Sequence, residues 1–174
     1  MAGPPKLREL LAALSGHRVE FIVVGGVAAV LEGVGMMTDD LDVLVETSEA
    51  NVERLLAALE DLEAIYRDPA GRSLRPDAER LASFRLHLLD TRLGRLDLLR
   101  TLKPGERSYA DLVSRSRVYR IGGLEIPVLE LAAVIESKEA ADRPKDRAAL
   151  PLLRRTLEEL QARGRLPGKS PSER

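Results

Sequence analysis

Two aspartates separated by one residue, Asp40 and Asp42, are the side chains whose type and spacing most directly suggest chemistry. They lie in an apolar run that predicts a strand over 40–46. Since strand side chains alternate, both carboxylates project from one face, and the intervening apolar residues take the other. Magnesium binds oxygen ligands, often one or two carboxylates together with substrate phosphates. The pair therefore predicts either a magnesium site or a solvated strand face.

A double glycine precedes this strand. Gly25 and Gly26 follow the β-branched and aromatic run 19–24, a predicted buried strand, and begin a small-residue segment that predicts a helix over 26–32. At such a turn, backbone N-H groups at the start of the helix can meet a phosphate, and the missing side chains allow close approach. Alone, the pair is equally a tight turn. Followed by paired aspartates, it indicates a site for a metal-bound phosphate.

A third carboxylate, Asp97, lies in the apolar run 95–99, which pairs with 84–89 as a predicted hairpin. In two-metal sites, one ion activates the attacking hydroxyl and the other neutralises charge on the leaving group. We predict that Asp97 completes such a site with Asp40 and Asp42 and helps to activate the acceptor. The alternative is an aspartate on an exposed edge strand.

These residues together resemble the DNA polymerase beta-type nucleotidyltransferase superfamily, over roughly 19 to 100. The sequence is most similar to the minimal bacterial nucleotidyltransferases, which include the nucleotidyltransferase halves of toxin/antitoxin and abortive-infection pairs. The motifs that carry the resemblance are Gly25-Gly26, Gly33, Thr38, Asp40-Leu41-Asp42 and Leu96-Asp97-Leu98.

The resemblance implies an α+β fold, with a mixed β-sheet flanked by helices and a small C-terminal helical part. It also implies magnesium-dependent transfer of an NMP from an NTP to a hydroxyl on RNA such as tRNA, on a protein or on a small molecule, and a cognate toxin or antitoxin as partner. Asp40, Asp42 and Asp97 would be the catalytic and metal-binding residues. Gly25, Gly26 and Thr38 would bind the phosphates.

A basic, proline-containing segment at 138–146 also resembles a motif near the end of those proteins. If the fold brings this turn over the glycine loop, Lys138, Arg143 and Lys145 would place cations at the phosphates. Alternatively, the segment is a polar turn between two helices.

The sequence departs from the family pattern at two positions. Gly26 stands where the family often has serine, and Met36 stands where many relatives have arginine, so a phosphate-binding hydroxyl and a cation are missing. An alternative to the enzyme is therefore a catalytically degenerate nucleotidyltransferase-fold protein that binds a nucleotide or a protein partner without turnover.

The remaining pattern predicts one nucleotidyltransferase-like αβ domain over 1–128, a helical extension over 129–163 packed on it, and a flexible tail over 164–174. The stretch 65–82 loses periodicity around its prolines and a glycine, so we expect an irregular connection there, with a weak strand over 64–67. Further helices are predicted over 6–14, 49–62, 109–115, 129–141 and 144–162, and a second hairpin over 117–121 and 124–128.

The charge of the chain neither requires nor excludes nucleic acid, because its 174 residues carry a formal net charge of -1 and no overall basic excess. Arginines around the first hairpin are either a basic strip for an RNA acceptor or a solvated face. They are Arg85, Arg92, Arg95 and Arg100.

Several classes of site are excluded. The chain has no cysteine, which removes disulfides, thiolate metal sites and cysteine nucleophiles. His17 and His87 stand alone, and we interpret them as a surface residue and a strand residue. The longest apolar run, 21–31, is too short to span a bilayer, and the N-terminus lacks an apolar signal core, so we expect a cytoplasmic protein.

Overall fold

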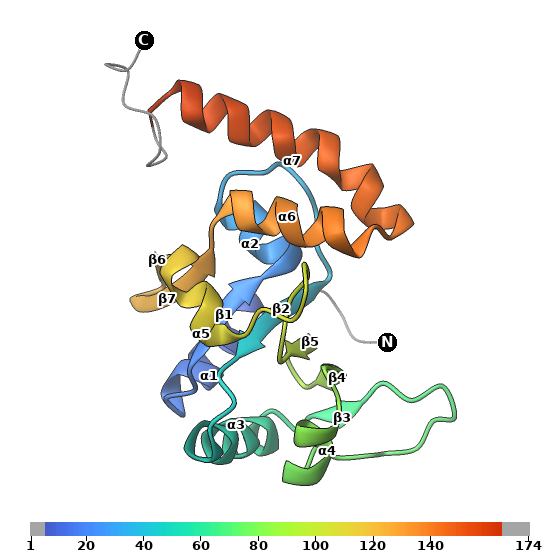
Figure 1. Ribbon diagram of the computed structural model, residues 1–174. Helices are drawn as coiled ribbons and strands as arrows, with labels where there is room; N and C mark the ends of the chain where they lie inside the picture. Colours follow the sequence, from blue (N-terminus) through green and yellow to red (C-terminus); the bar gives the residue numbers. More distant parts are fainter. Residues whose placement is uncertain (1–5, 165–174) are drawn as a thin grey trace.

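The fold is described from a computed structural model, which places residues 6–164. Residues 165–174, and with them nearly all of the predicted tail, lie outside the described residues. A seven-stranded sheet crosses the molecule in the order β3-β4-β5-β2-β1-β7-β6 (Figure 1). The strands are β1 (Phe21–Val24), β2 (Asp40–Val45), β3 (Ile65–Tyr66), β4 (Leu86–Thr91), β5 (Gly94–Leu99), β6 (Ser116–Ile121) and β7 (Leu124–Leu129).

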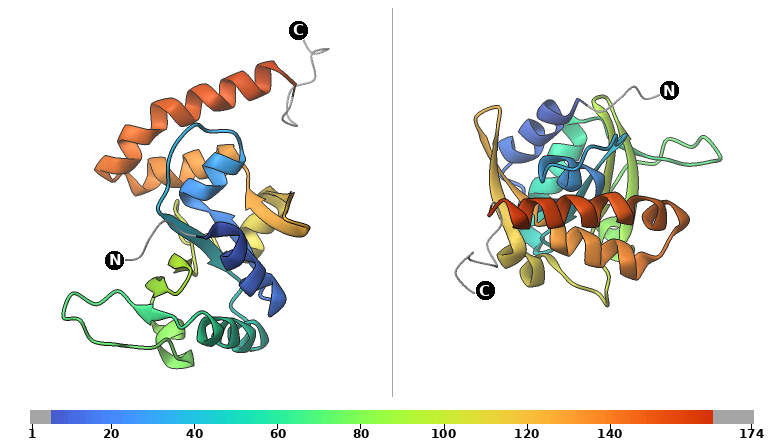
Figure 2. Two further views of the ribbon diagram at one scale, coloured as in Figure 1. Left: turned by 180° about the vertical axis from the view of Figure 1, so that it is seen from behind. Right: turned by 90° about the horizontal axis from the view of Figure 1, so that it is seen from above.

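Helices cover the two faces of the sheet. Figures 1 and 2 show α2, α6 and α7 gathered on one side, with α3 and α4 on the opposite side. The helices are α1 (Leu7–Gly16), α2 (Gly25–Leu31), α3 (Glu49–Asp61), α4 (Ala78–Ser83), α5 (Tyr109–Leu112), the 3-10 turn η1 (Val113–Arg115), α6 (Leu131–Ala141) and α7 (Pro144–Ala162).

The sheet is mixed, as predicted. β1 and β2 are antiparallel, with Val24 opposite Asp42, whereas β2 and β5 are parallel. β1 also pairs in parallel with β7, through Val23 and Val128. Parallel neighbours need crossover connections, and the chain supplies one of them through α3, β3, α4 and β4. The predicted α+β class with a nucleotidyltransferase-type mixed sheet is confirmed.

The sequence explains the central elements locally. β1 is apolar throughout and buried throughout, as expected of an interior strand. In β2, Leu41, Val43 and Val45 pack into the core on one face, whereas Asp40 and Asp42 are half-buried on the other face. Ser48 caps α3, because its hydroxyl accepts a hydrogen bond from the Asn51 N-H at 3.3 Å.

The stretch predicted to be irregular contains one helix, α4, and this prediction was wrong over 78–82. Asp77 caps α4 by accepting from the Arg80 N-H at 2.8 Å, so a cap signal was present although the helix is too short to show periodicity. β7 extends to Leu129, so α6 begins at Leu131, two residues later than predicted. The helix predicted over 109–115 divides into α5 and η1.

None of the helices within 6–164 combines the length and apolar character needed to cross a bilayer.

Candidate active site

The double glycine lies where β1 turns into α2, directly against β2. Gly25 has φ +64°, a left-handed conformation that favours glycine, and a Cβ added there would collide with the Asp42 carboxylate. A Cβ added at Gly26 would lie 2.8 Å from the Thr38 hydroxyl. The turn therefore brings bare backbone against the aspartate strand, as phosphate binding at this position requires.

Strand register places the three predicted carboxylates on one face of the sheet. Asp42 on β2 stands beside Asp97 on the parallel strand β5, and Asp40 stands beside Arg95. Asp97 is buried, with 8% of its surface exposed, whereas Asp40 and Asp42 are half-buried. The prediction that Asp97 shares a face with the other two agrees with this placement, but its proposed catalytic role stays a prediction.

Burial strongly affects the charge state of Asp42. It raises the pKa of this carboxyl to about 6, and repulsion from the Asp40 carboxylate adds to the increase. Lys145, Lys138 and Arg143 act in the opposite direction and lower the pKa. The predicted cations of the C-terminal segment therefore lie close enough to the aspartate strand to influence its charge.

The cations come from the junction between α6 and α7. α6 ends at Ala141 and is followed by Asp142 with left-handed backbone, and Pro144 is the first residue of α7. Asp146 in the first turn of α7 is fully buried and accepts from Lys138 Nζ at 3.2 Å and from Arg143 Nε at 2.6 Å. The predicted alternative, a polar turn between helices, is thus also present, because two of the three cations are held by Asp146.

Lys145 differs from these two cations, because it forms no ion pair with any residue within 6–164. Its side chain and those of Lys138 and Arg143 line the same cleft as Gly25 and Gly26. Lys145 is therefore available to a phosphate without breaking an existing pair.

The cleft has a volume of about 730 Å³ and runs from the glycine turn across β2 and β5 to β4. It is in the size range of small-molecule sites. Thr38 lies on its wall, and its hydroxyl donates to the Asp40 carbonyl at 3.2 Å. All nine predicted site residues line this one cleft. They are Gly25, Gly26, Thr38, Asp40, Asp42, Asp97, Lys138, Arg143 and Lys145.

The carboxylate oxygens of the cleft are ligands that suit magnesium, but the three carboxylates are not spaced as one metal site within residues 6–164. One oxygen of Asp40 is buried without a hydrogen-bond partner, which leaves it available as a ligand, whereas the corresponding oxygen of Asp97 contacts the Arg67 guanidinium. Within residues 6–164, however, no group of three or more acidic, histidine or cysteine side chains converges as a metal site. Because magnesium is commonly held by one or two carboxylates plus substrate phosphates, the Asp40 and Asp42 pair still fits it.

Two functional candidates were missed by sequence reasoning. The first is Arg67, just beyond β3, whose guanidinium contacts the Asp97 carboxylate and whose Nε lies 3.9 Å from Asp90. It falls in the stretch predicted to be irregular, although strand alternation from Ile65 would have placed it on this face. The second is Asp146, which the sequence presents only as part of the basic segment 138–146.

The predicted basic strip is divided by the sheet. Arg85 and Arg95 line the cleft, but Arg100 lines a second cavity, and Arg92 donates to the Asp61 carbonyl at 2.9 Å. The four arginines therefore do not form one continuous surface for RNA.

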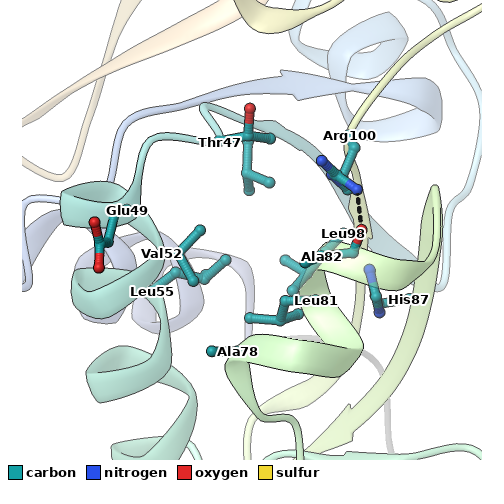
Figure 3. Close-up of a pocket in the computed structure, with 11 residues that line it drawn as sticks. Thr47, Glu49, Val52, Leu55, Ala78, Leu81, Ala82, His87, Leu98 and Arg100 are labelled. Atoms are coloured by element: carbon teal, nitrogen blue, oxygen red, sulfur yellow. Dashed lines mark hydrogen bonds between the residues drawn. The ribbon is translucent and has the colours of Figure 1, made fainter.

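The second cavity lies between α3, α4 and the opposite face of the sheet (Figure 3). Its volume is about 260 Å³, and apolar side chains such as Val52, Leu55 and Leu98 form most of its wall. His87 also lines it, with Nδ1 2.9 Å from the Tyr66 hydroxyl and Nε2 3.0 Å from the Phe84 carbonyl. Both ring nitrogens are thus occupied and burial lowers the pKa of His87, which indicates a structural histidine.

Comparison with known proteins gives similarity at the level of the fold. No family model matches the sequence, and no curated protein matches it either. Among solved structures, the chain is similar to the lincosamide antibiotic adenylyltransferase LnuA bound to lincomycin, with a TM-score of 0.56 and 14% identity, covering 85% of this chain and 94% of LnuA. It is also similar to ANT(2'')-Ia in complex with adenylyl-2''-tobramycin, with a TM-score of 0.55 and 17% identity, covering 90% and 91%.

A solution structure of ANT(2'')-Ia, described as an antibiotic-resistance factor, gives a TM-score of 0.53 and 16% identity, covering 91% of this chain and 89% of that one. The chain therefore has the nucleotidyltransferase fold. It spans nearly the whole length of these proteins, as expected of a minimal form of the fold.

Proposed function

We propose that this protein is a magnesium-dependent nucleotidyltransferase that moves an NMP from an NTP to an acceptor hydroxyl. The observation that carries the proposal is the register of β1, β2 and β5, which puts the glycine turn, Asp42 and Asp97 side by side in one cleft. The similarity to adenylyltransferase structures supports it at the level of the fold.

In this mechanism, the nucleotide enters with its triphosphate at the glycine turn. Backbone N-H groups at Gly25 and Gly26 and the Lys145 ammonium bind the phosphates. Asp40 and Asp42 would hold magnesium, which when bound polarises the phosphoryl oxygens and neutralises charge on the leaving pyrophosphate.

Asp97 lies on the side of Asp42 away from the glycine turn, where the acceptor would approach. The acceptor hydroxyl oxygen forms a bond to the α-phosphorus, and the bond from that phosphorus to the oxygen that bridges to the β-phosphate breaks. Pyrophosphate leaves with that oxygen, and the hydroxyl proton passes to the Asp97 carboxylate.

The test is label transfer from each common NTP labelled at the α-phosphate, with magnesium and either total tRNA, cell protein or a small-molecule extract as acceptor. We expect transfer by the native chain and a loss of at least about 100-fold in Asp40→Asn/Asp42→Asn. Asp61→Asn, a change of the same chemistry outside the cleft, should keep full activity. Nucleotide binding without transfer to any acceptor class would overturn the proposal.

A second candidate is a nucleotide-binding protein without turnover. Two observations favour it: Arg67 contacts the carboxylate that would take the proton, and within 6–164 the acidic side chains do not converge as a three-ligand site. In that case, the label-transfer assay gives no product, while titration with an NTP still shows binding that the double aspartate variant loses.

A role within a toxin/antitoxin pair is a separate proposal, supported by the sequence resemblance alone. It predicts that the gene next to this one encodes a protein that co-purifies with the chain and that one of the two arrests growth when expressed without the other. Absence of both effects would contradict it.

A further inference from the structure

We propose that the acceptor is a small hydroxyl compound carrying a phosphate or carboxylate group. This inference rests on the proposed function and narrows its acceptor class. The feature that carries it is the end of the cleft over β4 and the outer part of β5. Basic and apolar side chains line it, namely Arg67, Arg85, Lys103, Leu86 and Leu88.

The sheet order identifies this end as the acceptor side. The glycine turn and the cations of the α6 and α7 junction lie on the β1 side of Asp42, where the triphosphate is proposed to bind. On the other side, Asp97 pairs with Leu88 on β4, and Leu86 pairs with Leu99. Because the attacking and leaving oxygens lie roughly in line through the phosphorus, the acceptor must enter from the β4 side.

Arg85 and Lys103 are the cations at this end that remain available to an anion, because Arg67 is already paired. Its N-H group hydrogen-bonds to the Leu88 carbonyl at 3.0 Å, which fixes its backbone beside Asp97. Its buried guanidinium is already paired, because Nη2 contacts the Asp97 carboxylate and Nε lies 3.9 Å from the Asp90 carboxylate. Arg85 and Lys103 line the cleft and form no ion pair within the described residues, so an anionic ligand group would give these cations a partner.

The exposed charges that line this end of the cleft are positive. Arg85, Arg95 and Lys103 line this end and are exposed to the cleft. Apart from Asp40, Asp42 and Asp97, the acidic side chain that lines the cleft within the described residues is Asp39, which precedes β2 beside Thr38. A polycationic acceptor would meet these cations without enough carboxylates to pair with, whereas an anion would find complementary charge.

The same end favours a small acceptor over RNA. No aromatic side chain lines the cleft within residues 6–164, so bases have no stacking partner. Two arginines of the expected basic strip, Arg92 and Arg100, are directed elsewhere, and the net charge is -1. Leu86 and Leu88 are 38% and 39% exposed and provide apolar contact for a carbon skeleton.

Binding of matched probes tests the inference without turnover. Glucose and glucose 6-phosphate share one skeleton and differ by a phosphate, so ligand-observed NMR at physiological ionic strength compares their Kd values directly. Tobramycin serves as the polycation and a short oligouridylate as the RNA. We expect glucose 6-phosphate to bind at least about tenfold more tightly than glucose or tobramycin.

Variants then locate the phosphate. Lys103→Glu and Arg85→Glu should each weaken glucose 6-phosphate binding about tenfold. Arg120→Glu and Arg155→Glu, exposed arginines outside the cleft, should change it less than about twofold. Lys145→Ala should weaken NTP binding but leave glucose 6-phosphate binding unchanged. Thermal unfolding confirms that each variant is folded.

The outcomes separate this inference from the proposed function. If glucose 6-phosphate binds in a charge-dependent way but no label is transferred, the anion site is supported and the proposed nucleotidyltransferase activity is contradicted. Label transfer to the oligouridylate or to tobramycin contradicts the anionic acceptor but not the nucleotidyltransferase activity. The same conclusion follows if glucose 6-phosphate binding is lost in Lys145→Ala but kept in Lys103→Glu.

Discussion

At the scale of single residues, Gly26 and Thr38 depend on one another, because the Thr38 side chain occupies the space beside Gly26. The chain has Gly26 where the nucleotidyltransferases that its sequence resembles often have serine, and the Thr38 hydroxyl lies 2.8 Å from a Cβ added at Gly26. The Thr38 hydroxyl also donates to the Asp40 carbonyl at 3.2 Å, which holds it at the cleft wall. We infer that Thr38 supplies the hydroxyl that Gly26 cannot.

This pairing predicts a non-additive pair of substitutions. Gly26→Ser should raise the Kd for the NTP about tenfold, because its Cβ forces Thr38 out of its hydrogen bond. In Gly26→Ser/Thr38→Ala, the closest clash is removed and the new serine restores a hydroxyl, so the Kd should return to within about threefold of the native value. Isothermal titration with the best NTP measures both.

Gly35→Ser is the matched control, because an added Cβ at Gly35 meets nothing within 4 Å. It should leave the Kd unchanged. If the effects of Gly26→Ser and Thr38→Ala simply add in the double variant, the hydroxyl of Thr38 does not replace that of serine.

The residue pattern predicted much of the site but not its ion pairs. Alternation along one strand was enough to place Asp40 and Asp42 together, because that rule is local. The contact of Arg67 with Asp97 was not predictable from the sequence, because it joins a residue just beyond β3 to a residue of β5, and β4 lies between these two strands in the sheet. Such pairings depend on strand order, which no local pattern encodes.

At the scale of elements, the junction of α6 and α7 depends on Asp146. Burial raises the pKa of this carboxyl, but hydrogen bonds from Arg143 and Lys138 outweigh it and leave the pKa below the usual 3.8. Asp146 therefore stays charged and holds both cations beside the cleft. Its proposed role is to position these cations while Lys145 remains free to bind phosphate.

Asp146→Asn should weaken both folding and nucleotide binding. Loss of the carboxylate leaves Lys138 partly buried without its partner, at a cost of about 2 kcal/mol in the free energy of unfolding. The Kd for the NTP should rise about tenfold, because the two cations lose their fixed positions. Asp142→Asn breaks an exposed pair with Arg147 at the same junction and should change both quantities little.

The pH dependence of stability gives a separate readout. Because the pKa of Asp146 is lowered on folding, its stabilising effect is present above pH 3.8 and is lost as the pH falls below that value. The free energy of unfolding of Asp146→Asn, measured by urea titration at several pH values, should therefore decline less steeply below about pH 4 than that of the native chain. Parallel declines would show that Asp146 does not carry this effect.

The elements themselves were predictable where periodicity was long, as in α3 and α7, and were missed where it was short. α4 has six residues, less than two turns, so only its cap at Asp77 marked it. The parallel pairings of β2 with β5 and of β1 with β7 were not predictable, because crossover partners are chosen by packing across the whole sheet.

At the scale of the whole molecule, the sheet separates a polar cleft from an apolar cavity. On β2 the aspartates face the cleft, while Val45 lines the cavity beneath α3. The cleft contains the proposed chemistry, and the cavity, with its occupied histidine, contributes only packing. Stability and nucleotide binding should therefore respond to substitutions on different faces.

Substitutions in the cavity test this separation. Leu55→Ala enlarges the cavity and should lower the free energy of unfolding by about 3 kcal/mol, whereas Val52→Leu adds one methylene to open space and should raise it by about 0.8 kcal/mol. Thermal melts should move by several degrees down and by about 2 °C up, respectively. The Kd for the NTP, measured well below either melting temperature, should stay within about twofold of native in both. If the Kd instead rises in the destabilised variant and falls in the stabilised one, packing under α3 sets the position of the aspartate strand. The two faces of the sheet are then coupled through β2.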